Sequence, residues 1–157
     1  MFRKRIFKIA SAEDFDKLTL EIFQYQSENN DVYKQFLAFL KFDTTSVKKI
    51  RDIPFLPIDF FKQFKVITEK SESQEIFLSS GTTGSVQSKH FVTDLSVYEE
   101  SYLKSFELFY GPIKDYTMLA LLPSYQEREG SSLIYMVDDL IKKSNNLDSG
   151  FYLNDID

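Results

Sequence analysis

The stretch Glu75-Ile76-Phe77-Leu78-Ser79-Ser80-Gly81-Thr82-Thr83-Gly84 joins a short strand pattern to a loop of two serines, two threonines and two glycines. Glycines let backbone N–H groups approach an anion and tolerate positive φ, and hydroxyl groups donate hydrogen bonds to phosphate oxygens. The same residues also suit a polar turn between two strands, because Ser-Gly and Thr-Gly pairs are common in turns. A Walker A loop is excluded, because no Gly-Lys-Ser/Thr follows at the required spacing.

Strands and helices alternate along the chain on both sides of this loop. The patterns predict strands over 75–78, 89–93, 116–122 and 151–153, with helices that begin after Asp94 and at Ser131. Such alternation is typical of a layered α/β architecture, so we predict the α/β class.

The first 50 residues have a different, helical pattern. Ser11 is placed to cap a helix that reaches Tyr25, a break is expected over 27–30, and a second helix follows. Pro54 and Pro57 then impose an extended path. After them, the pattern predicts a short helix from Asp59, as its cap, to Phe64, and a strand over 66–68. We therefore predict a helical N-terminal segment, residues 1–52, packed on a partial α/β nucleotide-binding domain, residues 53–157.

Composition excludes several classes of function. The chain has 157 residues, a net charge of −5, one histidine and no cysteine. Duplex nucleic-acid binding would need a basic face, which these interspersed charges do not provide. Disulfides, thiolate metal sites and a cysteine nucleophile are excluded, and one histidine leaves little for a histidine metal site or a Ser-His-Asp triad. No apolar run suits a signal peptide or a membrane span, so we expect a cytoplasmic protein.

Two further places are candidates for the site. His90 follows the loop on the next predicted strand and is either an ordinary strand residue or a ligand contact. The segment Pro123 to Gly130 lies between a strand end and a helix start, where α/β sheets place ligands. In it Arg128 could neutralise an anion, and Ser131-Ser132 could present helix N-terminal amides. The alternative for this segment is a solvated charged loop.

Two other features have a structural and a functional interpretation. The aromatic residues Tyr98, Tyr102, Phe106 and Phe109 share a helical stripe that is either core or the lining of an acyl tunnel. Asp138-Asp139 resembles a metal pair, but adjacent helical residues diverge, which favours i,i+4 pairing with Lys142 and Lys143.

The string Ser79 to Gly84 resembles the signature of the adenylate-forming superfamily, which includes acyl-CoA synthetases. Within it, Ser88-Lys89, the helix from Asp94, Pro54 to Ile58, and Phe61-Lys62 resemble the acyl-protein synthetase (LuxE) branch over about residues 50 to 135. The commonest pattern has Pro, Lys and Gly where this chain has Val86, Gln87 and Ser88, with Lys89 displaced by two positions.

The resemblance implies an ATP-dependent ligase. In such enzymes a carboxylic acid, in this branch a fatty acid, reacts with ATP to give an acyl-adenylate, with Mg²⁺ as the accompanying ion, and the acyl group then moves to a thiol of coenzyme A or of a protein. The residues that the resemblance assigns to ATP are Ser79, Ser80, Gly81, Thr82, Thr83, Gly84 and Lys89. No Tyr-Gly-x-Thr-Glu segment and no late catalytic lysine segment is found, so we expect the chain to be the front part of a longer enzyme that is inactive alone.

Two alternatives stay open at this point. In the first, the loop is only a turn, and the chain is a non-catalytic binding or assembly module. In the second, a different phosphate-handling activity is complete within these residues.

Overall fold

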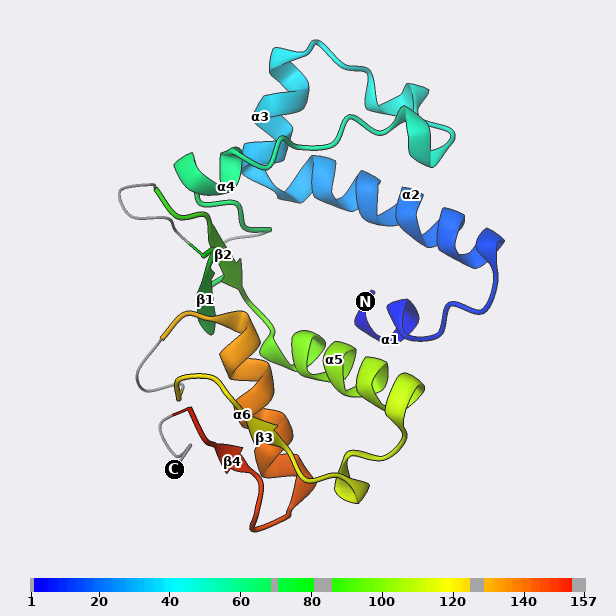
Figure 1. The fold of residues 1–157 in the computed structure, drawn as a ribbon. Helices are drawn as coiled ribbons and strands as arrows, with labels where there is room; N and C mark the ends of the chain where they lie inside the picture. Colours follow the sequence, from blue (N-terminus) through cyan, green and yellow to red (C-terminus); the bar gives the residue numbers. More distant parts are fainter. Residues whose placement is uncertain (1, 69–70, 81–85, 125–128, 154–157) are drawn as a thin grey trace. The chain divides into compact units, whose positions relative to one another are not determined.

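The computed structural model describes residues 2–68, 71–80, 86–124 and 129–153. In this part of the chain it contains six α-helices, three 3-10 turns and four short strands that form two-stranded sheets (Figure 1). The expected mixture of helix and strand is confirmed, with helix as the larger component.

The chain divides into two compact units. The first comprises Met1–Gln74 and Ser88–Thr93, and the second comprises Glu75–Gln87 and Asp94–Asp157. The division into domains at residue 52 stays a prediction.

The first unit is mainly helical. Its elements are α1 (Arg3–Ile6), α2 (Ala12–Asn29), α3 (Asp31–Phe39), two 3-10 turns (Thr44–Ser46 and Ile50–Asp52), α4 (Phe60–Gln63) and β2 (Lys89–Val92).

Helix α2 begins where the sequence predicts and ends later. The Ser11 hydroxyl accepts a hydrogen bond of 3.0 Å from Asp14 N, so the predicted cap is confirmed. The break expected over 27–30 is confined to Asn30, because the Ser27 hydroxyl donates to the Gln24 carbonyl and stays compatible with helical backbone. The helix stops only at Asn30, whose side chain accepts from Tyr33 N and starts α3.

The core of this unit consists of side chains from both long helices and from the segment after them. Phe23, Tyr33, Leu37 and Ile53 are buried together, and the rings of Phe23 and Tyr33 pack edge to face at 6.2 Å. The Tyr33 hydroxyl donates to the Pro54 carbonyl over 2.9 Å, which fixes the extended Pro54 segment against α3.

Two local expectations in this unit are wrong. Residues 66–68 form no strand, and the Thr68 hydroxyl donates instead to Gln26 on α2 over 2.7 Å. Asp59 does not cap α4, because its backbone is helical and its carboxylate pairs with Lys62 at 2.9 Å.

The second unit contains the remaining elements. They are β1 (Glu75–Leu78), α5 (Leu95–Tyr110), a 3-10 turn (Ile113–Asp115), β3 (Leu119–Ala120), α6 (Ser132–Ser144) and β4 (Gly150–Phe151). The helix boundaries follow the predicted signals: Asp94 accepts from Ser96 N at the start of α5, and Ser131 accepts from Ile134 N at the start of α6. Asn145 ends α6 in the left-handed conformation, φ 52°.

Strands β3 and β4 pair in parallel, with Leu119 opposite Gly150, and lie side by side next to α6 (Figure 1). Of the strand expected over 116–122, only Leu119 and Ala120 form a strand. Its residues alternate between buried and exposed, as Ala120 and Leu119 do, but β4 offers only two residues for ladder hydrogen bonds.

No helix in the described ranges combines the length and the apolar character that a bilayer crossing requires.

Candidate functional site

The predicted phosphate loop follows directly on the end of β1, and both belong to the second unit. Phe77 on this strand is buried against Tyr98 and Tyr135, with ring centroids 5.3 Å and 5.6 Å away, so the strand is anchored to α5 and α6. Ser79 and Ser80 follow at the surface with exposed side chains. Gly81, Thr82, Thr83 and Gly84 lie outside the described residues.

Gln87 links the far side of this loop to its beginning. Its side-chain Nε2 donates a hydrogen bond of 2.8 Å to the backbone carbonyl of Ser79. This bond joins two residues that are eight positions apart in the sequence. Gln87 is not among the ATP-binding residues predicted from the sequence, although it occupies the position where the commonest superfamily pattern has lysine.

A second contact holds the strand end that precedes the loop. Leu78 N donates to the carbonyl of Gly130 over 2.8 Å, and Gly130 has φ +79°. This residue ends the segment Pro123 to Gly130, so the structure brings the end of that candidate segment next to the start of the loop. Arg128 lies outside the described residues.

Ser131 and Ser132 both have structural partners at the start of α6. The Ser131 hydroxyl caps the helix by accepting from Ile134 N, and the Ser132 carbonyl accepts from the Tyr98 hydroxyl over 3.0 Å. A role for the α6 amides in anion binding stays a prediction.

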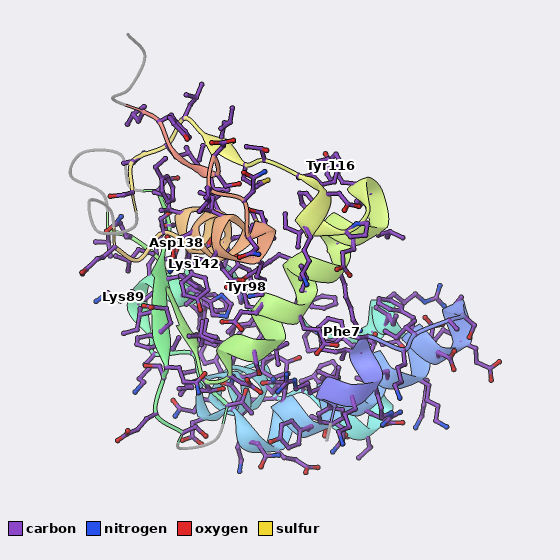
Figure 2. All side chains as sticks on the ribbon, turned by 90° about the horizontal axis from the view of Figure 1, so that it is seen from below. Phe7, Lys89, Tyr98, Tyr116, Asp138 and Lys142 are labelled. Carbon is purple, nitrogen blue, oxygen red and sulfur yellow. The ribbon has the colours of Figure 1, made fainter. Side chains whose placement is uncertain are left out.

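Lys89, the remaining residue assigned to ATP, is the first residue of β2 and has an exposed side chain (Figure 2). It belongs to the first unit, whereas Ser79 and Ser80 belong to the second. Its contact with phosphate stays a prediction.

His90 lies next to Lys89 and borders a pocket in the first unit. Its ring packs edge to face on Phe61 at 6.2 Å. The pocket has a volume of about 420 Å³, and all of its lining residues belong to the first unit. One side comes from α2, one from the segment 53–56, and the rest from Phe61, residues 66–68 and β2. Sequence reasoning missed this pocket, because its walls come from segments up to about 70 residues apart that no local pattern links.

Polar groups in this pocket are held by hydrogen bonds to one another. Gln26 Oε1 accepts from the Thr68 hydroxyl over 2.7 Å and from Asn30 Nδ2 over 3.3 Å. Burial raises the pKa of Tyr33 to about 12, so its hydroxyl stays protonated near neutral pH.

The aromatic stripe of α5 is mostly core. Tyr102 is buried and packs edge to face on Tyr98 at 5.0 Å, and its hydroxyl donates to Asp139 on α6. Burial and the neighbouring Asp139 raise the pKa of Tyr102. Phe109, by contrast, is 78% exposed and lies outside this packing. The described contacts therefore favour the structural interpretation of the stripe.

The aspartates of α6 form the helical ion pairs that their spacing predicts. Asp138 pairs with Lys142 and Asp139 pairs with Lys143, and Figure 2 shows Asp138 and Lys142 together on α6. Across the residues that the structure describes, no group of three histidine, aspartate or glutamate side chains could hold a metal ion.

The family model described as acyl-protein synthetase, LuxE, matches residues 8–106, well over half of the chain. The match includes the loop, β2 and most of α5, and it begins upstream of the region where the sequence motifs resemble this family. Neither a curated protein nor a solved structure matches the chain.

Proposed function

The chain belongs to the LuxE family of acyl-protein synthetases, and from this premise we propose that it is the N-terminal part of an ATP-dependent acyl-activating ligase. The observation that carries the proposal is that the family match spans the loop Ser79 to Gly84, whose residue types suit phosphate binding.

The proposed reaction is adenylation of a carboxylic acid, in this family a fatty acid. A carboxylate oxygen attacks the α-phosphorus of ATP, the bond to the β-phosphate oxygen breaks, and pyrophosphate leaves. The loop hydroxyls and amides, with Lys89, would hold the β- and γ-phosphates. They would thereby stabilise the negative charge that develops on the leaving group.

Two hydrogen bonds hold the residues that flank this loop, and they support the proposal. The Gln87 side chain bonds to the Ser79 carbonyl, and Leu78 N bonds to the Gly130 carbonyl. A loop whose ends are fixed loses less conformational entropy when it closes on a ligand than a free one does.

Mg²⁺ would neutralise phosphate charge when ATP is bound. The ion would bind the nucleotide phosphates and keep several waters, as is common for this metal.

The second step transfers the acyl group to a thiol. Because the 157 residues contain no cysteine, the thiol would belong to coenzyme A or to a protein cysteine outside these residues. Both acceptors fit the cytoplasmic location expected from the sequence.

The test is carboxylate-dependent exchange between ATP and pyrophosphate, measured with protein from the complete natural reading frame and a panel of fatty and aryl acids. The double variant Gly81→Ala/Thr82→Ala should lower the exchange rate by about a hundredfold or more. It removes the Thr82 hydroxyl, and it adds a Cβ atom at Gly81, where the proposed mechanism has the backbone approach a phosphate. Ser101→Ala on the exposed side of α5 is the control and should leave the rate unchanged.

Absence of exchange with every acid, from folded protein with Mg²⁺ present, would overturn the proposal. In that case the loop is a turn, and a non-catalytic binding module becomes the better explanation. Unchanged exchange in the double variant would instead remove the loop from the mechanism.

A further inference from the structure

The segment of residues 39–52 connects the end of α3 to the extended Pro54 segment and has no part in the proposed chemistry at the loop (Figure 1). It starts with two apolar side chains that lie in solvent, since Phe39 is 84% exposed and Leu40 is 46% exposed. A single exposed apolar side chain is ordinary, but an adjacent pair gains free energy when a partner removes both from water.

The backbone of Lys41 gives the end of α3 an unusual residue. Its φ is +50°, in the left-handed region that favours glycine. Lys41 N donates to the Ala38 carbonyl over 3.0 Å. Phe42 N donates to the Leu37 carbonyl, also over 3.0 Å, which completes a Schellman motif, the turn in which glycine usually takes the position of Lys41. A lysine kept at this strained position favours a role for its charged side chain.

Basic side chains accompany the exposed apolar pair. Residues 39–52 contain four basic and two acidic residues, whereas the whole chain has a net charge of −5. All four basic side chains are exposed: Lys41, Lys48, Lys49 and Arg51. The two carboxylates are engaged with backbone amides, because Asp43 accepts from Thr45 N and Asp52 accepts from Lys49 N, each over 2.9 Å.

The inward packing of two neighbours keeps these lysines on the outside. Phe42 and Val47 both pack against the buried cluster that contains Leu37. Lys41 precedes Phe42 and Lys48 follows Val47, so both lysines extend into solvent from residues that are fixed on one core. The segment therefore presents apolar and cationic side chains at the surface of the first unit.

We propose that this segment docks on an anionic lipid surface. Phe39 and Leu40 enter the boundary between headgroups and acyl chains, and the four basic side chains contact the negatively charged headgroups. Lysine is depleted in protein–protein interfaces, so the composition of this segment favours lipid over an acidic protein surface. The proposal goes beyond the adenylation reaction and does not require it.

The experiment measures co-sedimentation of protein from the complete natural reading frame with lipid vesicles. One set is phosphatidylcholine with about 30% phosphatidylglycerol, and the other is phosphatidylcholine alone. We expect binding to the anionic vesicles that is at least about tenfold tighter than to the neutral ones. It should weaken by about tenfold or more when salt is raised from about 0.1 M to about 0.5 M.

Phe39→Ser tests the apolar contact. It should weaken binding to the anionic vesicles by about tenfold, because it removes the ring that enters the lipid boundary. The matched control is Phe109→Ser near the end of α5, where the ring is also largely exposed, and it should leave binding within about twofold.

Lys48→Gln/Lys49→Gln tests the charges. The double variant should weaken binding by about tenfold or more, because each lysine near an anionic surface contributes about fivefold. Lys17→Gln/Lys114→Gln removes the same charge from two exposed positions elsewhere in the chain and should leave binding within about twofold.

Lys41→Gly separates binding from stability. It removes a charge but supplies the residue that the left-handed turn favours, so binding should weaken by about fivefold without a lower melting temperature. A purely structural role for Lys41 would not produce this combination.

Circular dichroism establishes that each variant is folded, and the lysine variants decide the matter if Phe39→Ser is not. Equal binding to both kinds of vesicle, or losses of the same size in the segment variants and their controls, would overturn the proposal. Absence of binding to anionic vesicles would also overturn it and would leave an acidic protein surface as the partner that suits these charges. Because the assay contains no ATP, failed adenylation and failed lipid docking are distinguishable.

Discussion

The backbone N–H of Leu78 donates a hydrogen bond of 2.8 Å to the carbonyl oxygen of Gly130. Leu78 is the last residue of β1, and Gly130 is buried immediately before the cap of α6. A Cβ atom on Gly130 would lie 3.1 Å from two carbon atoms of the Leu78 side chain, and its φ of +79° is strained for other residues. The strand end before the proposed ATP loop is thus fixed by a position that suits only glycine.

Gly130→Ala should disturb the loop through this contact. We expect a loss of about 1–3 kcal/mol in the free energy of unfolding, and a several-fold rise in KM for ATP in pyrophosphate exchange, because Leu78 must shift. Gly111→Ala is the matched control, since Gly111 also has positive φ, +87°, but nothing lies within 4 Å of an added Cβ. Equal KM values for the two variants would contradict a role for the Leu78 contact.

Gln87→Ala should weaken ATP binding by releasing the end of the loop. It removes the hydrogen bond from Gln87 Nε2 to the Ser79 carbonyl, which is exposed and contributes little to global stability. We expect a rise of about two- to fivefold in KM for ATP with a melting temperature within about 2 °C of the unchanged chain. Gln35→Ala, at an exposed position of α3, is the control, and a KM change of the same size there would refute the prediction.

Asn30→Ala should cost more stability than Ser11→Ala, although both remove a helix cap. Asn30 is only 5% exposed, accepts from Tyr33 N over 3.1 Å and donates to Gln26 over 3.3 Å. Ser11 is exposed and makes one capping bond. We expect losses of about 2 and about 1 kcal/mol in urea unfolding, and a reversed order would show that the buried amide contributes less than its hydrogen bonds imply.

Tyr33→Phe should change the pH dependence of stability. Burial raises the pKa of Tyr33 to about 12, above the value of about 10 for an unfolded chain. The stability that this residue contributes is therefore complete below pH 10 and is lost as pH rises toward 12, because the unfolded state ionises first. The phenylalanine variant lacks this loss.

At pH 7 the variant should be less stable by about 1 kcal/mol, since the hydroxyl no longer donates to the Pro54 carbonyl. The difference between the two proteins should shrink between pH 10 and pH 12. Urea unfolding at several pH values measures it, and a constant difference would contradict the assigned pKa direction.

Local signals in the sequence predicted the helices and caps well. Ser11, Asp94 and Ser131 cap the helices that follow them, and the Asp138 and Asp139 ion pairs form as their spacing predicts. These features depend on residues within one helical turn of each other, so a single sequence contains the information.

Features that depend on distant partners were not predicted. Residues 66–68 have a strand pattern, but Thr68 is held by Gln26, 42 residues earlier. The strand over 116–122 is shortened because its partner β4 offers two residues. The Leu78 contact with Gly130 and the pocket of the first unit likewise arise from tertiary packing. The positions of the loop residues 81–84 stay a prediction.

The parallel pairing of β3 with β4 has a consequence for the order of folding. Met118 and Ser149, which bond across the start of this pair, are 31 residues apart, and α6 lies between them. By contrast, α2 and α3 are joined at Asn30 alone, and their contacts are local in sequence. Closing the longer loop costs more entropy before any strand contact forms, so we expect the α2/α3 hairpin to form early and the β3/β4 pair last. In pulsed hydrogen exchange during refolding, the amide of Gly150 should then gain protection after the amides of α3, and protection in the reverse order would refute this sequence of events.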